Sequence, residues 1–324
     1  MKEGIGAAFV LGAGLGTRLR ALTEDRPKPL VPIFGKPLIT FAFDHLRAAG
    51  VKKFVVNTHH RPEAYETYLG AKDGRAEYEG LPVHLRHEPV LLDTGGGIKN
   101  VEDLLGDAPF LVQNGDVLAD VPLDRLIERH LSVGNVATLL LRSSGGPAQV
   151  QLNDATGLVT DIRGSIGGRT EPAFLFSGIY ILSPQIFRHI PAEEMVSIVP
   201  IFLEMIRAGE RVGGMVLDEG TWFDLGTRES YLEAHRRFAR PETALSYPLD
   251  RPWPQRVHPS AQVGEGVTFE GVCAIGAKAE IGAGAQLTDC VLWENAKIAS
   301  RSRLSACIVR EGRSAEGELS GADI

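Results

Sequence analysis

The sequence predicts an α/β protein with a mixed, mostly parallel sheet covered by helices on both faces, followed by a small C-terminal left-handed parallel β-helix. Three observations lead to this fold class. Short apolar runs alternate with segments of helical periodicity through about residue 240. A proline-rich stretch at 241–256 then interrupts the pattern. Beyond it, apolar residues recur at every sixth position, the period of a hexapeptide β-helix.

The N-terminal half supplies the centre of the expected sheet. Strands are expected at 7–11, 53–57, 83–86, 110–112 and 136–141, and helices at 37–49, 62–69, 98–105 and 123–131. The strand segments are continuous apolar runs, which are typical of strands buried on both faces. Because alternating strands and helices form a Rossmann-like sheet, we expect ligands beyond the carboxyl ends of its strands.

The following segment, 143–172, is richer in Gly, Ser and Asp, and we interpret it as a side lobe of hairpin-like strands at 150–152 and 159–162. The chain then returns to the sheet. Strands are expected at 174–182 and 212–217, and helices at 196–208 and from 227 to about 238. These elements complete a first domain over residues 1–240.

The region 257–310 carries the six-residue repeat. The repeating positions are Val257, Val263, Phe269, Ile275, Ile281 and Leu287, and Ile298 and Leu304 resume the period after a slip of one residue. Cys273, Cys290 and Cys307 are 17 residues apart, close to one coil, so we interpret them as stacked, buried small residues rather than reactive thiols. Residues 311–324 are polar and Gly-rich, and we expect a flexible tail.

Composition limits the partners and the compartment. The net charge of −7 argues against a general nucleic-acid or anionic-membrane surface. No apolar run approaches the roughly 18 residues that a membrane-spanning helix needs. The three cysteines form no C-x-x-C pair, which fits a reducing compartment. We therefore expect a cytoplasmic protein with neither nucleic-acid nor membrane partners.

A glycine-rich loop follows the first strand, with Gly12, Gly14 and Gly16 at alternate positions. Glycine permits positive φ and close approach to the main chain, and successive amides in such a turn bind anionic oxygens. Arg18 and Lys28 add two positive charges. The combination suits a triphosphate, with a plain tight turn as the structural alternative.

The spacing excludes two commoner phosphate-binding loops. In the dinucleotide fingerprint G-x-G-x-x-G, the third glycine would fall at position 17, which is Thr17. The string G-x-x-x-x-G-K-[ST] of a P-loop does not occur in the sequence.

Together with Pro27–Pro29, this stretch resembles the N-terminal signature of the sugar-1-phosphate nucleotidyltransferases. The resemblance implies that the loop and Arg18 hold the phosphates of a nucleoside triphosphate (NTP), and that Lys28 contacts them during transfer. The nucleotide-binding residues of this loop are then expected to be Leu11, Gly12, Ala13, Gly14, Gly16 and Thr17. Arg18, Lys28 and Asp116 are the expected catalytic residues.

Two aspartates are the expected Mg²⁺ ligands. Asp116 follows a buried strand and a glycine, so its carboxylate is suitably placed to hold Mg²⁺ beside a phosphate site; a turn aspartate is the alternative. Asp224 matches the second metal-binding aspartate of the family, with a helix N-terminal acid as the alternative.

Two further segments match the family pattern. Asp93, Thr94 and Gly95 resemble the loop that reads the base and contacts the sugar, although glycines before a helix also make plain anion-binding or capping turns. Gly178 matches the glycine that lines the sugar pocket, with a simple core strand as the alternative.

One motif of the family is missing. Many relatives carry Glu-Lys-Pro shortly before the strand at 174–182, and its lysine grips the sugar phosphate. The aligned positions here are Gly164 and Ser165. Our hypothesis is that Arg163 or Arg169 takes over this role.

The resemblance implies transfer of a nucleotidyl group from an NTP to a sugar-1-phosphate, with release of pyrophosphate. The motifs are similar to those of N-acetylmuramate-1-phosphate uridylyltransferases, whereas the added β-helix is similar to that of mannose-1-phosphate guanylyltransferases and glucose-1-phosphate thymidylyl- or adenylyltransferases. UTP or GTP is favoured, with an N-acetylmuramate-, mannose- or glucose-1-phosphate type acceptor.

Two other functions stay open. One is a non-catalytic regulatory subunit that senses an NDP-sugar. The other is acyl transfer by the β-helix, for which only His258 is a candidate base in that region. We expect the β-helix to pack against the catalytic domain or a second subunit, and the protein to be a homo-oligomer.

Overall fold

The computed structural model describes residues 4–14, 16–167 and 171–324. Contacts within the chain divide it into two compact units. The first comprises Met1–Leu15 and Phe41–Asp224, and the second comprises Gly16–Thr40 and Leu225–Ile324. This division differs from the sequential one at residue 240, because a short N-terminal segment belongs to the same unit as the β-helix.

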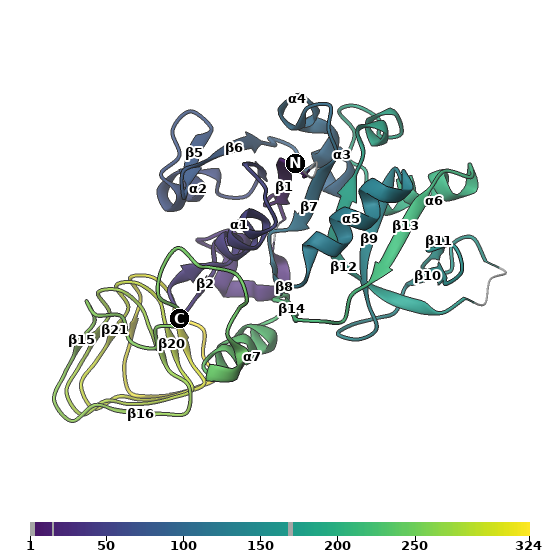
Figure 1. Ribbon diagram of the computed structural model, residues 1–324. Helices are drawn as coiled ribbons and strands as arrows, with labels where there is room; N and C mark the ends of the chain where they lie inside the picture. Colours follow the sequence, from purple (N-terminus) through teal and green to yellow (C-terminus); the bar gives the residue numbers. More distant parts are fainter. Residues whose placement is uncertain (1–3, 15, 168–170) are drawn as a thin grey trace. The chain divides into compact units, whose positions relative to one another are not determined.

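A ten-stranded sheet is the core of the first unit (Figure 1). Its strands are β1 (Ala7–Leu11), β4 (Lys53–Thr58), β5 (Arg75–Tyr78), β6 (Leu81–His87), β7 (Phe110–Asn114), β9 (Ala137–Arg142), β10 (Val150–Asn153), β11 (Leu158–Ile162), β12 (Ala173–Leu182) and β13 (Val212–Val216). Their order across the sheet is β10-β11-β13-β9-β12-β7-β1-β4-β6-β5. The mixed α/β class expected from the sequence is confirmed.

This sheet is parallel in the block β7-β1-β4-β6 and in the pair β9-β13. Strand β12 runs antiparallel to both β7 and β9, so the sheet is less parallel than expected. In the described part of the chain, no helix separates β9, β10, β11 and β12. Strands without a helical crossover need not be parallel, which accounts for the difference.

The helices connect these strands and lie close to the expected positions. They are α1 (Leu38–Ala48), α2 (Pro62–Leu69), α3 (Asp93–Asn100), α4 (Glu102–Leu105), α5 (Leu123–Val133) and α6 (Ile198–Arg207). Buried apolar residues of α3 and α6 join those of the central strands in one core cluster, in which Phe9, Ile98 and Phe202 are fully buried. No helix among the described residues is long and apolar enough to cross a membrane.

Two short strands that the sequence reading missed form a separate ladder in the first unit. These are β8 (Val117–Asp120) and β14 (Thr221–Asp224), which pair in antiparallel fashion. Each is only four residues long, and β14 has no fully buried residue, so neither strand produces a strong apolar run.

The second unit brings the N-terminal segment, helix α7 (Arg228–Phe238) and the β-helix together. The segment contains the 3₁₀ helices η1 (Thr17–Thr23) and η2 (Lys28–Leu30) and the short strands β2 (Pro32–Ile33) and β3 (Lys36–Pro37). The Tyr231 hydroxyl donates to the carbonyl of Pro32 at 2.6 Å and accepts from Trp293 Nε1 at 3.0 Å. Tyr231 therefore links all three parts.

The β-helix consists of three parallel sheets that stack its successive coils, as the repeat predicts. Their strand orders are β15-β18-β21-β24, β16-β19-β22-β25 and β17-β20-β23. The bounds are β15 (Gln262–Val263), β16 (Thr268–Glu270), β17 (Ala274–Ile275), β18 (Glu280–Ile281), β19 (Gln286–Thr288), β20 (Val291–Leu292), β21 (Lys297–Ile298), β22 (Arg303–Ser305), β23 (Ile308–Val309), β24 (Ser314–Ala315) and β25 (Glu318–Ser320).

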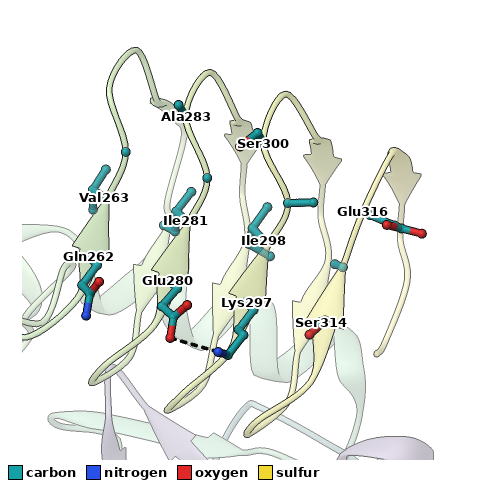
Figure 2. Close-up of a pocket in the computed structure, with 14 residues that line it drawn as sticks. Gln262, Val263, Glu280, Ile281, Ala283, Lys297, Ile298, Ser300, Ser314 and Glu316 are labelled. Carbon is teal, nitrogen blue, oxygen red and sulfur yellow. Dashed lines mark ion pairs between the residues drawn. The ribbon is translucent and has the colours of Figure 1, made fainter.

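Side chains repeat from coil to coil along the first of these sheets (Figure 2). Val263, Ile281 and Ile298 form one row, while Glu280 and Lys297 lie in another row and pair at 3.0 Å. A pocket of about 910 Å³ lies along this sheet, and none of its lining residues is a predicted site residue. The three cysteines are free and buried in the β-helix core, as expected.

The expectation of a flexible tail at 311–324 is wrong. Strands β24 and β25 continue two of the sheets, and the Arg310 amide donates to the carbonyl of Ile324 at 2.8 Å. The short strands expose most of their side chains, so the segment reads as polar although its backbone is paired.

Candidate nucleotide- and metal-binding site

Gly12 directly follows β1 and is held on both sides by hydrogen bonds within the first unit. Its amide donates to Asn57 Oδ1 at 2.8 Å, and its carbonyl accepts from the Tyr65 hydroxyl at 2.8 Å. A Cβ at this position would lie 2.6 Å from the carbonyl oxygen of Asn57. Gly12 is thus required by close packing, and its amide bonds to Asn57; its place in a phosphate-binding loop stays a prediction.

The next residues of the loop are more open. Ala13 is buried, whereas Gly14 is exposed and has no atom within 4 Å of an added Cβ position. Leu11 is partly exposed. Contact between Gly14 and a phosphate therefore remains a prediction that the local space allows.

Gly16 and Lys28 lie against each other in the second unit. Gly16 has φ = 63° and precedes η1, and a Cβ there would lie 3.0 Å from Cβ of Lys28. Thr23 Oγ1 donates to the Gly16 carbonyl at 3.1 Å. The left-handed conformation and this packing both require glycine. Lys28 is buried, while Thr17 is exposed.

Arg18 packs on a second glycine of the same unit. A Cβ on Gly226 would lie 2.9 Å from Cζ of the Arg18 guanidinium. Any larger residue at 226 would displace that guanidinium. The glycine of Asp224-Leu225-Gly226 therefore has a physical role that the sequence reading did not assign.

Asp116 and Asp224 are brought together by the β8–β14 ladder. In the register of that ladder, Asp224 faces Val117, the residue directly after Asp116. Directly opposed residues of an antiparallel pair have Cα atoms roughly 4.5–5.5 Å apart. Burial raises the pKa of Tyr65, and the nearby charge of Asp116 raises it further. Asp116 therefore lies near both Asp224 and Tyr65, the tyrosine that holds Gly12.

This pair of carboxylates suits Mg²⁺, which prefers oxygen ligands and is commonly held by one or two carboxylates plus substrate phosphates. Over residues 4–14, 16–167 and 171–324, no group of three or more His, Cys, Asp or Glu side chains could hold a metal by itself. Asp116 and Asp224 therefore fit a Mg²⁺ site in which two carboxylates supply some of the oxygen ligands and the substrate phosphates supply others.

The segment expected as a base-reading loop is helical, because α3 begins at Asp93 rather than at Ile98. Two of its predicted residues bond within the protein. The Gly95 amide donates to the Val196 carbonyl at 2.8 Å, and Thr94 Oγ1 accepts from the Ile198 amide at 2.9 Å. Added Cβ atoms would meet backbone oxygens at 2.9 Å for Gly95 and 2.3 Å for Gly96. Glycine is thus explained here by close packing.

Gly178 occupies an irregularity of β12, between the two stretches that pair with β9. It has φ = 77°, and an added Cβ would lie 2.6 Å from Nδ2 of Asn114, two residues before Asp116. The conformation and the close approach of Asn114 both require glycine. A role in lining a sugar pocket stays a prediction.

Of the two arginines predicted to bind the sugar phosphate, Arg163 lies in the described part of the chain. Arg163 is exposed, and its Nε donates to Gln149 Oε1 at 3.1 Å. Arg169 lies outside the described residues. The amides of Ile166 and Gly167 donate to the Asp161 carboxylate at 3.1 and 2.9 Å, which shapes the loop after Arg163.

Asn57, Tyr65 and Glu88 bond to the candidate site or to one another, and the sequence did not point to them. Asn57 Nδ2 donates to Glu88 Oε1 at 2.8 Å, and both side chains are buried. Burial raises the pKa of Glu88, while the hydrogen bonds from Asn57 and the Leu92 amide act in the opposite direction. A signal was available, since Asn57 and Glu88 lie at or just beyond the carboxyl ends of two parallel strands.

Comparison with known proteins identifies relatives of this chain. The profile of the family described as nucleotidyl transferase matches residues 7–240. Mannose-1-phosphate guanylyltransferase of Mycobacterium tuberculosis is 31% identical over 299 residues, covering 90% of this chain and 80% of that protein. N-acetylmuramate alpha-1-phosphate uridylyltransferase of Neisseria meningitidis is 34% identical over 222 residues, covering 68% and 93%.

Solved structures confirm the fold. UDP-glucose pyrophosphorylase from Acinetobacter baumannii superposes with a TM-score of 0.62 at 20% identity, covering 74% of this chain and 95% of that one. HddC from Yersinia pseudotuberculosis gives a TM-score of 0.58 at 24% identity, covering 71% and 98%. At these identities the likeness concerns the fold alone.

Proposed function

The chain belongs to the nucleotidyl transferase family, and we propose that it transfers a nucleotidyl group from an NTP to a sugar-1-phosphate, releasing pyrophosphate. The observation that carries this proposal is the register of β8 and β14, which places Asp224 opposite the neighbour of Asp116. In the proposed reaction a sugar phosphate oxygen attacks the α-phosphorus in line, and pyrophosphate leaves. No side-chain nucleophile is needed.

The work of the protein is to position two anions and to balance their charge. Arg18 and Lys28 supply fixed positive charge, and packing on Gly226 and Gly16 holds them in place. Asp116 and Asp224 would hold Mg²⁺, which neutralises phosphate charge when bound. Gly14 offers open main chain for a phosphate oxygen.

The same proposal assigns the remaining predicted residues to the nucleotide and the sugar. Asp93 at the start of α3 and its neighbours would face the base and sugar, while the bonds of Thr94 and Gly95 to the α6 side hold that helix start in place. Gly178 would line the sugar site, and Arg163 or Arg169 would bind the sugar phosphate.

GTP and mannose-1-phosphate are the first substrate pair that we propose. The support is coverage: the mycobacterial guanylyltransferase aligns over 90% of this chain, a span that exceeds the 234 residues matched by the family profile and so includes part of the C-terminal region. The second pair is UTP with N-acetylmuramate-1-phosphate. Its support is the higher identity, 34%, to the meningococcal uridylyltransferase, and the absence of Glu-Lys-Pro.

A grid of pyrophosphate-release assays tests these proposals. GTP, UTP, ATP, CTP and dTTP are each combined with mannose-, glucose- and N-acetylmuramate-1-phosphate, with and without Mg²⁺. One productive, Mg²⁺-dependent pair is expected. If every pair is silent while an NDP-sugar binds, the protein is the non-catalytic sensor instead.

We further propose that the enzyme is a homo-oligomer in which a second copy covers the first coil of the β-helix. Val257, Val263 and Phe269, which repeat as inward positions of that coil, are 39%, 43% and 37% exposed. Strands β15 and β16 are the edge strands of their sheets, so their outer backbone groups offer a template for pairing. A cytoplasmic location is supported by three cysteines that are buried free thiols.

A further inference from the structure

Three hydrogen bonds, two of them fully buried, form a continuous series in the first unit from the glycine loop to the start of α3. The Gly12 amide donates to Asn57 Oδ1 at 2.8 Å, and Asn57 Nδ2 donates to Glu88 Oε1 at 2.8 Å. The other carboxylate oxygen, Glu88 Oε2, accepts from the Leu92 amide at 3.2 Å. Asn57 and Glu88 are each 1% exposed.

The chemistry of the four groups determines which of them donates and which accepts in each hydrogen bond. The backbone amides at the two ends can only donate, and an ionised carboxylate can only accept. An Asn amide between them has one acceptor and one donor, so it satisfies both neighbours in a single orientation. Buried networks whose groups are all satisfied favour one geometry, whereas an unsatisfied buried group is costly.

Glycine packing and a tyrosine fix the same parts from the other side. An added Cβ on Gly97 would lie 2.9 Å from Asn57 Nδ2 and 3.0 Å from Glu88 Oε1. Helix α3 therefore approaches these two side chains as closely as glycine permits. The Tyr65 hydroxyl holds the Gly12 carbonyl at 2.8 Å. The glycine loop and the start of α3 are therefore set with respect to each other through Asn57 and Glu88.

We propose that Asn57 and Glu88 are positioning residues for the nucleotide, holding the phosphate-side loop at Gly12 in register with the base-side start of α3 at Leu92 and Asp93. This inference rests on the proposed function, in which one NTP contacts both places. Neither side chain needs to contact the nucleotide, because each acts through the backbone that it holds.

Single substitutions disrupt this series of hydrogen bonds in defined ways. Asn57→Asp places two carboxylates face to face, and Glu88→Gln places an amide donor opposite a donor. The double variant Asn57→Asp/Glu88→Gln restores every bond: the new carboxylate accepts from Gly12 and from the new amide, whose carbonyl accepts from Leu92. The swap keeps the total charge and nearly the same volume.

The readout is the Kd for Mg-GTP and Mg-UTP from calorimetry, followed by the KM for each substrate of the productive pair. Each single variant is expected to raise the nucleotide Kd and KM about tenfold or more, or about 1.4 kcal/mol. The KM for sugar-1-phosphate is expected to stay within about twofold. The double variant is expected to return the nucleotide Kd to within about threefold of the wild type.

Asn135→Asp is the matched control. Asn135 is also buried and donates to a side chain, Thr138 Oγ1 at 3.1 Å, but it precedes β9 at the opposite end of the sheet from Gly12. Loss of stability alone lowers the fraction of active enzyme, and so lowers kcat while leaving Kd and KM unchanged. We expect that pattern for the control only.

Folded single variants with a wild-type nucleotide Kd would overturn the inference, as would a folded double variant that fails to restore binding. If the single variants do not fold, the double variant and Tyr65→Phe decide the question. Tyr65→Phe removes one bond to Gly12 and is expected to raise the nucleotide Kd about threefold. A double variant within about threefold of the wild-type Kd, together with this rise for Tyr65→Phe, supports the inference. A double variant that binds nucleotide poorly, or a Tyr65→Phe variant with an unchanged Kd, overturns it. A wild type that binds nucleotide but releases no pyrophosphate refutes the proposed function, while the Kd values still judge this inference.

Discussion

At the residue scale, two carboxylates are the part of the candidate site that is proposed to hold Mg²⁺. Asp116 follows β7, and Asp224 ends β14 opposite Val117. A carboxylate and an amide have nearly the same shape, so Asn at position 116 removes charge without removing volume. This makes the substitution a test of metal binding rather than of packing.

Asp116→Asn is expected to lower kcat/KM by about a hundredfold or more, because charge stabilisation of the transferring phosphoryl group is lost. Pyrophosphate release over a Mg²⁺ titration measures the effect. Asp124→Asn, on an exposed residue in the first turn of α5, is the control and is expected to stay within about twofold. Near-normal activity of the Asp116 variant would rule out its metal role.

The arginines near the side lobe give a second residue-scale prediction. Replacing both Arg163 and Arg169 by Ala is expected to raise the KM for sugar-1-phosphate about tenfold, because a charge-assisted contact to the phosphate is lost. The KM for the NTP is expected to stay unchanged. Arg207→Ala, which removes the bond to the Ser165 carbonyl at 3.1 Å, controls for changes in loop shape. An unchanged KM for the sugar phosphate in the double variant contradicts the hypothesis.

At the scale of elements, helix α7 is fixed to the N-terminal segment by a neutral histidine. His235 Nδ1 contacts the Tyr231 carbonyl at 2.9 Å, and a carbonyl only accepts, so Nδ1 carries the proton. The other nitrogen, Nε2, then accepts from the Phe34 amide at 3.3 Å. Burial lowers the pKa of His235 from 6.5 to about 4, against the opposing effect of the Tyr231 hydrogen bond.

This histidine predicts a loss of stability in mild acid. Above pH 6.5 the ring is neutral in both states, so the protein is unaffected. Between pH 6.5 and about 4 the unfolded state binds the proton and the folded state does not. The free energy of unfolding is then expected to fall by about 1.4 kcal/mol per pH unit, or about 2 kcal/mol at pH 5.

Urea unfolding at pH 7 and pH 5 measures this effect, with His235→Gln as the comparison. The Gln carbonyl can accept from the Phe34 amide but does not titrate. The variant is expected to lose about 2 kcal/mol less than the wild type on acidification, since other titrating groups contribute equally to both proteins. An equal loss in the two proteins would refute the prediction.

The end of η1 depends on an arginine of the β-helix, which gives a second element-scale prediction. Arg310 Nη1 donates to the Ala21 carbonyl at 2.7 Å and contacts Glu24 and Asp25 at 3.0 and 3.1 Å. Its side chain is 11% exposed. Arg310→Ala is expected to lower the free energy of unfolding by about 2 kcal/mol, because the partly buried Ala21 carbonyl loses a charged donor that is itself mostly buried.

The functional consequence follows from the position of η1, which carries Arg18 in its first turn. The KM for the NTP is expected to rise in the Arg310 variant. Arg303→Ala is the control, since its pair with Glu318 at 3.2 Å is exposed on both sides and contributes less than about 1 kcal/mol. Equal stability losses in the two variants would contradict a special role of Arg310.

At the scale of the whole molecule, the two ends of the β-helix differ in how many apolar side chains they expose. The last coil includes strands β24 and β25 and the paired C-terminus. The first coil leaves Phe269 and two valines more than a third exposed. Apolar groups at an open edge favour association with a partner that covers them.

Phe269→Glu in the full-length chain is expected to shift the homo-oligomer toward monomer, because a charge at the covered end is costly to desolvate. Light scattering during size-exclusion chromatography measures the mass. Leu131→Glu replaces an apolar residue of similar exposure, 40%, on α5 and is expected to leave the mass unchanged. An oligomer that tolerates the Phe269 change would place the interface elsewhere.

Elements whose signals are local in the sequence were predicted well, and those set by distant contacts were not. Helix α2 and strand β1 were predicted with their observed bounds, because apolar periodicity and nearby Pro or Gly define them. The early start of α3 was missed, because three successive glycines read as a loop. They form a helix here, where backbone at 194–197 packs too closely for any side chain at two of them.

By itself, the sequence determined the α/β class, the hexapeptide β-helix, and a candidate set that includes Arg18, Lys28, Asp116 and Asp224. These features follow from periods of two to six residues and from short motifs. Only the tertiary structure decided that Asp224 faces the neighbour of Asp116, and that Gly12 is tied through Asn57 to Glu88. The bonds from Gly12 to Asn57 and from Asn57 to Glu88 span 45 and 31 residues. Such partners are selected by strand order and packing, so no local pattern specifies them.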